Sequence, residues 1–172
     1  MALTDRVINL INTIPLFRGF DDTEVEAFLG FTTSASYSSK SIILKEGEKG
    51  KRLYIIERGV AGVITPIHVR EDLKKPLEQK YKILAQLCEG DFFGEIGLFT
   101  SNPRSASILA KSVVEVICLG ENERDDLENR QPGICCKFYH NLIGEMAKRL
   151  LSSNEIIREY YRAVNPGLKV VR

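Results

Sequence analysis

The sequence predicts an α+β domain in which a β-structure of short strands is flanked by helices. Three observations support this prediction. Both ends of the chain place apolar residues three and four positions apart, which is typical of helices. Residues 32–120 contain short β-prone runs between turn residues. The length of 172 residues, with 44% hydrophobic and 27% charged side chains, suits one globular domain with an apolar core. We therefore expect a single domain over residues 1–172.

Two short helices are expected in residues 1–31. The runs "LTDRVINLI" and "DDTEVEAFLGF" both have helical apolar spacing, and an aspartate that can cap a helix begins the second run. The segment "IPLFRGF" lies between them and is expected to be a turn.

Short strands are expected over residues 32–120. About seven runs qualify: "ASYSS", "SIILKEGEKG", "RLYIIERG", "VAGVITPIHV", "KYKILAQLCEG", "SASILAK" and "VVEVICLG". Short strands at this close spacing predict a closed barrel or a sandwich. The polar stretch "HVREDLKKPLEQK", which contains Pro76, is expected to be an exposed loop between two strands.

Helices are expected again over residues 121–162. "ENERDDLENR" predicts a short charged helix, and a long helix should begin at Pro132 and end near Tyr161, before "NPG". About 30 residues at about 1.5 Å each would span about 45 Å, which is longer than the domain needs. We expect this helix to overhang the β-structure and its apolar stripe to need a partner. The stripe is interrupted by "SSN" and consists of Phe138, Leu142, Met146, Leu150, Ile157 and Tyr161.

Composition narrows the function classes. Lys and Arg number 24 and Asp and Glu 23, so a net charge of +1 provides no global field for nucleic acid or a membrane surface. The N-terminus lacks the features of a secretory signal, and no run of about 18 apolar residues occurs. We expect a cytoplasmic protein that binds neither nucleic acid nor membrane. The four cysteines lack C-x-x-C spacing and are expected to be buried, reduced thiols rather than metal ligands.

The segment "FGEIGLFTSNPRSAS", residues 93–107, carries the polar groups that point to a ligand. A tight turn into "EIGLF" would expose backbone N–H groups that can bind an anion. Arg104 offers a fork of donors that matches two phosphate oxygens, and Ser105 adds a hydroxyl. Glu95 can only accept hydrogen bonds, so beside a phosphate it suits a ribose hydroxyl. The residues alone leave a second interpretation open, in which Glu95 and Arg104 form an ordinary structural ion pair.

Two longer stretches carry a family resemblance. "IILKEGEKGKRLYIIERGVAGV" followed by "GDFFGEIGLFTSNPRSAS" closely resembles the cyclic nucleotide-binding domain family. This family includes the bacterial catabolite activator proteins, the regulatory subunits of protein kinase A and nucleotide-gated channels. The resemblance covers nearly the whole chain. It implies an eight-stranded antiparallel β-roll that holds cyclic AMP or cyclic GMP.

The resemblance also implies roles for individual residues. Glu95 would bind the ribose 2′-hydroxyl, and Arg104 and Ser105 would contact the phosphate. Gly94, Ile96, Gly97 and Ala106 would surround the sugar and phosphate in the same cassette, residues 93–107. The segment "MAKRLLSSN" resembles the long helix of catabolite activators, which would put Arg149 near the cassette and Ser153 and Asn154 near the base.

The predicted function is a stand-alone cyclic nucleotide sensor without catalysis, cofactor or metal. Only "AVNPGLKVVR" follows the long helix, so we expect no helix-turn-helix and no DNA binding. Ser153 and Asn154 favour cyclic AMP over cyclic GMP. We expect a protein effector, whose identity the sequence does not give, and a homodimer through the C-terminal helix.

The sequence leaves three alternatives to a cyclic nucleotide sensor. An enzyme would use Cys136 with His140, four positions apart on a helix, but no oxyanion hole or orienting carboxylate is evident. A metal-dependent β-barrel needs a histidine cluster, whereas His68 and His140 are the only two histidines. The strongest alternative is a degenerate β-roll that serves as a protein-interaction module and binds another ligand or none.

Overall fold

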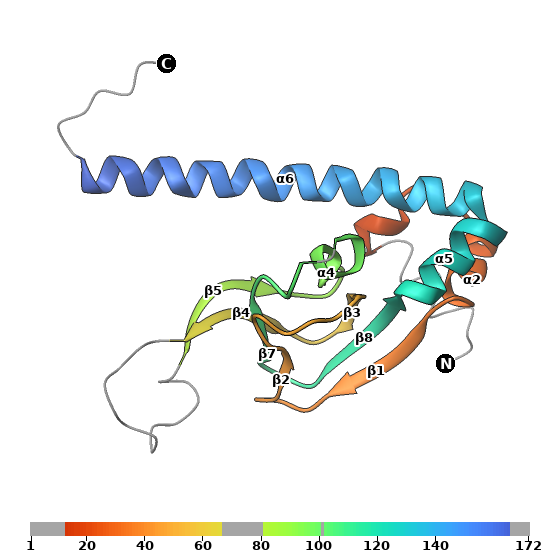
Figure 1. Ribbon diagram of the computed structural model, residues 1–172, viewed down its shortest axis with the longest axis horizontal. Helices are drawn as coiled ribbons and strands as arrows, with labels where there is room; N and C mark the ends of the chain where they lie inside the picture. The colour runs from red at the N-terminus through yellow and green to blue at the C-terminus, as the bar shows by residue number, and fades with distance from the viewer. Residues whose placement is uncertain (1–12, 67–80, 101, 166–172) are drawn as a thin grey trace.

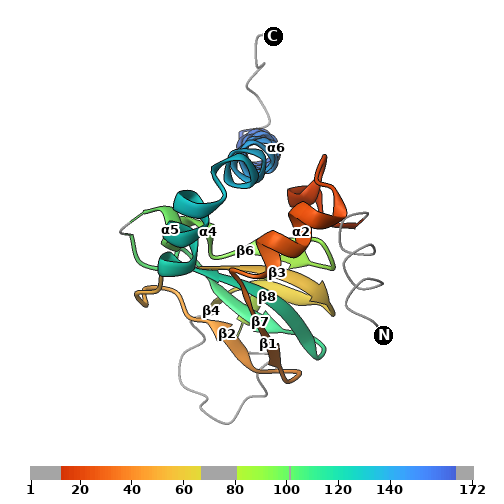
Figure 2. The same cartoon turned by 90° about the vertical axis from the view of Figure 1, so that its right-hand side faces the viewer.

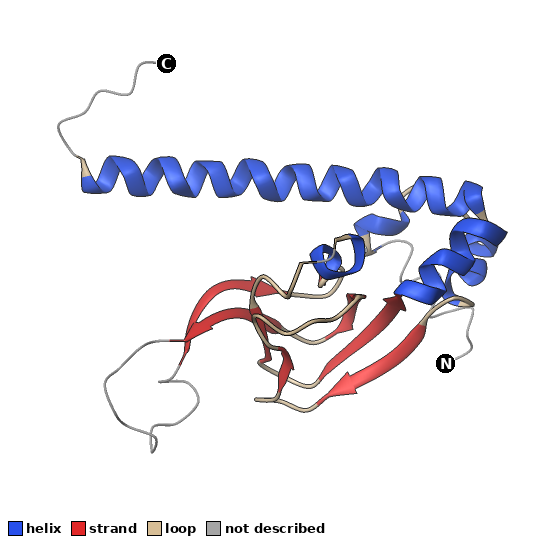
Figure 3. Ribbon diagram, in the orientation of Figure 1, coloured by secondary structure: helices blue, strands red, loops and turns tan. Residues whose placement is uncertain are grey.

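The computed structural model describes residues 13–66, 81–100 and 102–165 (Figure 1). Its centre is a β-roll of two four-stranded antiparallel sheets, with helices packed along one side and one long helix extending past the roll (Figures 1 and 3). The predicted α+β class with an eight-stranded antiparallel roll is therefore confirmed. The predicted first helix and the polar stretch around Pro76 lie outside the described residues.

The strands follow the predicted runs, with one addition. The first sheet has the order β1-β8-β3-β6 and the second β2-β7-β4-β5. The strand missing from the sequence prediction is β6, which has only two residues and therefore no readable alternation. The strands are β1 Thr33–Tyr37, β2 Ile42–Leu44, β3 Arg52–Arg58, β4 Ala61–Pro66, β5 Tyr81–Leu87, β6 Phe92–Phe93, β7 Ser107–Ala110 and β8 Val114–Gly120.

The helices have local causes in the sequence. Asp21 caps α2, because its carboxylate accepts a hydrogen bond from the Glu24 amide at 2.9 Å and the Glu24 carboxylate accepts one from the Asp21 amide. The long helix α6 begins at Pro132, as predicted. The described helices are η1 Pro15–Phe17, α2 Asp22–Leu29, α4 Glu95–Phe99, α5 Glu121–Arg130 and α6 Pro132–Val164.

The two central strands of the first sheet, β3 and β8, are buried on both faces. Alternate residues of β3, such as Leu53 and Ile55, pack against the helices together with Phe28 and Phe138. The other buried residues of this strand, Tyr54 and Ile56, face the second sheet inside the roll. Figure 2 shows this arrangement end-on, with α2 and α6 on the outer side of the sheet. Burial on both faces explains why "LYII" is continuously apolar.

The long helix has two different halves. In the first half, Phe138 and Leu142 are buried, and the Asn141 side-chain amide donates to the Leu16 carbonyl at 3.0 Å. In the second half, Leu150 is 64% and Ile157 63% exposed, and Figure 1 shows this half extending past the roll. The expected overhang of the apolar stripe is therefore present.

The four cysteines differ in burial. Cys118 and Cys135 are buried, but Cys88 and Cys136 are exposed, so the expectation of four buried thiols is wrong for two of them. In the described part of the chain, no helix combines the length and apolar character that a membrane span requires.

Candidate functional site

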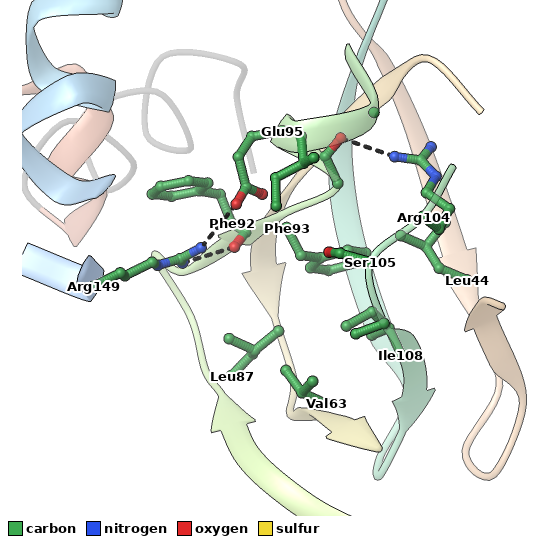
Figure 4. Close-up of a pocket in the computed structure, with 14 residues that line it drawn as sticks. Leu44, Val63, Leu87, Phe92, Phe93, Glu95, Arg104, Ser105, Ile108 and Arg149 are labelled. Carbon is green, nitrogen blue, oxygen red and sulfur yellow. Dashed lines mark hydrogen bonds and ion pairs between the residues drawn. The ribbon is translucent and has the colours of Figure 1, made fainter. Parts of the chain in front are cut away.

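The predicted cassette lines a pocket between α4, the inner side of the roll and α6 (Figure 4). Eight of the ten residues predicted to bind ligand lie in its wall. They are Gly94, Glu95, Ile96, Gly97, Arg104, Ser105, Ala106 and Arg149. The rest of the wall was not predicted and is apolar: Leu44, Val63, Leu87, Phe92, Phe93 and Ile108. The pocket therefore combines a polar cassette with an apolar wall.

The cassette turn depends on Gly94. Its φ of +83° lies in the left-handed region, directly before α4 begins at Glu95. A Cβ atom at Gly94 would lie 2.6 Å from the carbonyl oxygen of Arg52, too close for any side chain. Only glycine therefore allows the chain to turn here and present α4 to the pocket.

Arg104 is buried in the pocket wall, with only 6% of its surface exposed. Its Nη1 donates hydrogen bonds to the carbonyl oxygens of Arg52 at 3.0 Å and Gly94 at 2.8 Å. Its backbone is held as well, because the Arg104 amide donates to Glu48 and the Arg104 carbonyl accepts from Gly47, both at 2.9 Å. Burial lowers the pKa of Arg104 from its ordinary value, although an arginine remains charged at neutral pH.

Glu95 pairs with an arginine of the long helix rather than with Arg104. Glu95 is 8% exposed, and its carboxylate Oε1 lies 3.7 Å from Nη1 of Arg149. Arg149 is oriented by Phe92, since its Nη2 donates to the Phe92 carbonyl at 2.7 Å and its guanidinium lies 3.9 Å from the centre of the Phe92 ring. Figure 4 shows Arg149 and Arg104 on opposite sides of the pocket, with Glu95 turned toward Arg149. Among the described residues, the Glu95–Arg104 ion pair considered above does not form.

Ser153 and Asn154 do not join the site. Both are exposed on α6, one turn beyond Arg149, and neither lines the pocket. The Ser153 hydroxyl donates to the Arg149 carbonyl at 2.9 Å, a local bond within the helix. In this structure, the predicted contact between these two residues and a base is therefore not pre-formed.

The residues of the enzyme and metal alternatives lie elsewhere. Cys136 and His140 are exposed and line a separate hollow at the junction of α5 and α6. No hydrogen bond links them in the described part of the chain, which does not include His68. Within residues 13–66, 81–100 and 102–165, no group of three or more His, Cys, Asp or Glu side chains is arranged to hold a metal ion.

Comparison with known proteins identifies the family. A family model described as "Cyclic nucleotide-binding domain" matches residues 35–130, more than half of the chain. The chain belongs to the cyclic nucleotide-binding domain family. The resemblance stated from the sequence is thus confirmed.

Two curated relatives illustrate the range of proteins that contain this domain. The human potassium/sodium hyperpolarization-activated cyclic nucleotide-gated channel 1 is 27% identical over 171 residues, which is 96% of this chain and 18% of the channel. The cAMP-activated global transcriptional regulator CRP of Salmonella typhimurium is 34% identical over 135 residues, 78% of this chain and 58% of the regulator. The chain therefore spans about a fifth of the channel and somewhat over half of the regulator.

Solved structures share the fold of this cyclic nucleotide-binding domain. The Thermus thermophilus catabolite activator protein has a TM-score of 0.69 at 26% identity, over 86% of this chain and 63% of that one. A cyclic nucleotide-binding domain from Methylobacillus flagellatus has a TM-score of 0.73 at 22% identity, over 98% and 86% of the two chains. At 22% identity, the similarity to the Methylobacillus flagellatus domain shows a shared fold and nothing more.

Proposed function

We propose that this domain binds a cyclic nucleotide, with cyclic AMP preferred over cyclic GMP, and regulates a protein effector through α6 without catalysing a reaction. One observation carries the proposal. A buried arginine and a buried carboxylate, Arg104 and Glu95, lie in one pocket beside an apolar wall. Such a combination suits a ligand with a phosphate, a hydroxyl-bearing sugar and a flat apolar ring system.

Arg104 supports the phosphate assignment. A buried guanidinium is costly unless a negative group compensates for it. Within the described residues, Arg104 donates to two neutral carbonyls and forms no ion pair, because Glu95 pairs with Arg149. A bound phosphate would supply the missing charge, and the Ser105 hydroxyl lies in the same wall.

Glu95 and Arg149 support the sugar assignment and link the ligand to α6. At 3.7 Å the Glu95–Arg149 ion pair is loose, so the carboxylate can accept a hydrogen bond from a ribose 2′-hydroxyl at the same time. If Glu95 moves when the ligand binds, its ion pair with Arg149 changes as well. Since Arg149 belongs to α6, ligand binding and the position of the long helix become coupled.

The exposed half of α6 supports a homodimer. Met146 is 38%, Leu150 64%, Ile157 63% and Tyr161 51% exposed, and these residues follow one face of the helix. Two copies packed in parallel would bury this stripe around a twofold axis. Pairing, or a movement of α6 toward the roll, would also bring Ser153 and Asn154 to a base, which is the basis for preferring cyclic AMP.

Calorimetric titration of the purified chain tests the proposal. We expect saturable binding of cyclic AMP, weaker binding of cyclic GMP, and much weaker binding of 5′-AMP, whose linear phosphate carries an additional charge. A rise in melting temperature with cyclic AMP should accompany binding. If none of the three nucleotides binds at millimolar concentration, the degenerate interaction module is the correct interpretation.

A further inference from the structure

We propose that Tyr54 is a positioning residue for Arg104, with its aromatic ring supporting the guanidinium that faces the ligand phosphate. The inference rests on the cyclic nucleotide function proposed above. Tyr54 lies outside the pocket wall, so any effect it has on the ligand must act through another residue.

The ring of Tyr54 lies beside the guanidinium. Cζ of Arg104 is 5.8 Å from the ring centroid, within the range of a cation–π contact. Tyr54 is only 8% exposed, so this contact is largely shielded from water. Shielding strengthens the attraction between a cation and an aromatic face.

The orientation of the Tyr54 ring is itself fixed. It stacks on the ring of Phe93, with centroids 5.1 Å apart and planes inclined by 8°. The two residues face each other across the β3–β6 pair. Phe93 and Arg104 both line the pocket, so Tyr54 lies behind the wall and contacts both of these lining residues.

The hydrogen bonds and the Tyr54 ring contact different parts of the Arg104 guanidinium. Both side-chain hydrogen bonds of Arg104 in the described residues start from Nη1, one to Arg52 on β3 and one to Gly94 after β6. These two bonds hold the Nη1 end of the planar guanidinium, whereas the Tyr54 ring lies beside its central carbon, Cζ. The ring therefore supports the guanidinium at a second point.

Gly94 supports the same arrangement. A Cβ atom at this position would lie 2.8 Å from Nη1 of Arg104 and 3.2 Å from Cδ2 of Tyr54. The guanidinium and the ring therefore converge on the small volume left by this glycine. The turn, the ring and the arginine act together to hold one geometry.

Affinity measurements on matched variants test the role of the ring. Tyr54→Phe keeps the ring and should bind cyclic AMP within about twofold of the parent, whereas Tyr54→Leu should bind about five- to tenfold more weakly, as expected for loss of a shielded cation–π contact. The loss should disappear when Tyr54→Leu is made in an Arg104→Ala background. Phe20→Leu removes a similarly buried aromatic side chain from the other core cluster, away from the pocket wall, and serves as the control.

NMR of the arginine side chains provides a measurement that needs no ligand. In the parent, the Arg104 guanidinium protons, assigned by their loss in Arg104→Ala, should be shifted upfield by the Tyr54 ring. Tyr54→Phe should preserve the shift, and Tyr54→Leu should abolish it.

The two hypotheses fail in different ways. A parent that binds no cyclic nucleotide but has the shifted Arg104 protons overturns the proposed function and leaves the positioning role supported. Unshifted Arg104 protons in the parent overturn the positioning role, even if Tyr54→Leu does not fold. An affinity loss that persists in the Arg104→Ala background, or that Phe20→Leu reproduces, also overturns it.

Discussion

Replacing Arg104 by alanine should remove most of the affinity for cyclic AMP while the domain remains folded. A hydrogen bond to a charged group contributes about 1.5–3 kcal/mol, which corresponds to a loss of roughly ten- to a hundredfold and more. The free energy of unfolding should change less than the binding free energy. The carbonyls of Arg52 and Gly94 each lose one donor, at about 0.5–1.5 kcal/mol for each bond, and the removal of a buried charge offsets part of this cost. A net loss near 1 kcal/mol lowers the melting temperature by about 2–4 °C in a chain of this size.

Calorimetric titration gives the affinity, and a thermal melt confirms folding. Arg104→Lys should recover only part of the binding, because an ammonium group offers a point charge instead of a planar fork. Arg58→Ala is the matched control, since Arg58 is exposed at the end of β3 and does not line the pocket. Undiminished binding by folded Arg104→Ala would refute the phosphate assignment.

Three further predictions address the sugar, the dimer and the core. Glu95→Gln should discriminate less than the parent between cyclic AMP and its 2′-deoxy analogue, because an amide accepts hydrogen bonds less well than a carboxylate; equal discrimination by the two proteins would contradict the ribose role. Leu150→Glu should convert a dimer into a monomer in sedimentation, because it buries a charge in the paired stripe, whereas a parent that is monomeric with and without nucleotide would disprove the dimer. Burial raises the pKa of Tyr37 to about 12 and also raises that of Tyr139. The folded chain therefore keeps tyrosine protons that the unfolded chain releases above about pH 10, so the contribution of these tyrosines to the free energy of unfolding should be constant below pH 10 and fall as the pH rises toward 12. Tyr37→Phe should reduce this fall in melts recorded at pH 8, 10 and 11, and an unchanged pH profile would count against the burial of Tyr37 as its cause.

The position of Arg149 shows how the site depends on parts of the chain that are far apart. Arg149 contacts Glu95 and Phe92, more than fifty residues earlier in the sequence. The contact depends on the first half of α6, where Lys137 pairs with Glu24 at 2.6 Å and Asn141 binds the Leu16 carbonyl. These contacts hold α6 against the N-terminal segment and thereby fix the position of Arg149 relative to the cassette.

The sequence alone determined the elements whose causes lie within a few residues. Helix α5 has the predicted bounds, α6 begins at the predicted proline, and Asp21 caps α2. The cassette could be predicted for the same reason. A left-handed turn at Gly94 depends on the missing Cβ of that residue, and the groups proposed to bind a phosphate and a sugar follow within a dozen positions.

Tertiary structure decided which distant groups meet at the pocket. The apolar wall takes Leu44, Val63 and Leu87 from three strands, and their apolar character alone does not distinguish a pocket wall from the core. The same holds for Tyr54, whose place beside Arg104 depends on the pairing of β3 with β6. Helical spacing predicted that Ser153 follows Arg149 along α6, but it did not predict that the pocket ends at Arg149. Local backbone preferences are encoded over one or two turns of chain, whereas the distance between two elements is the result of all the packing between them.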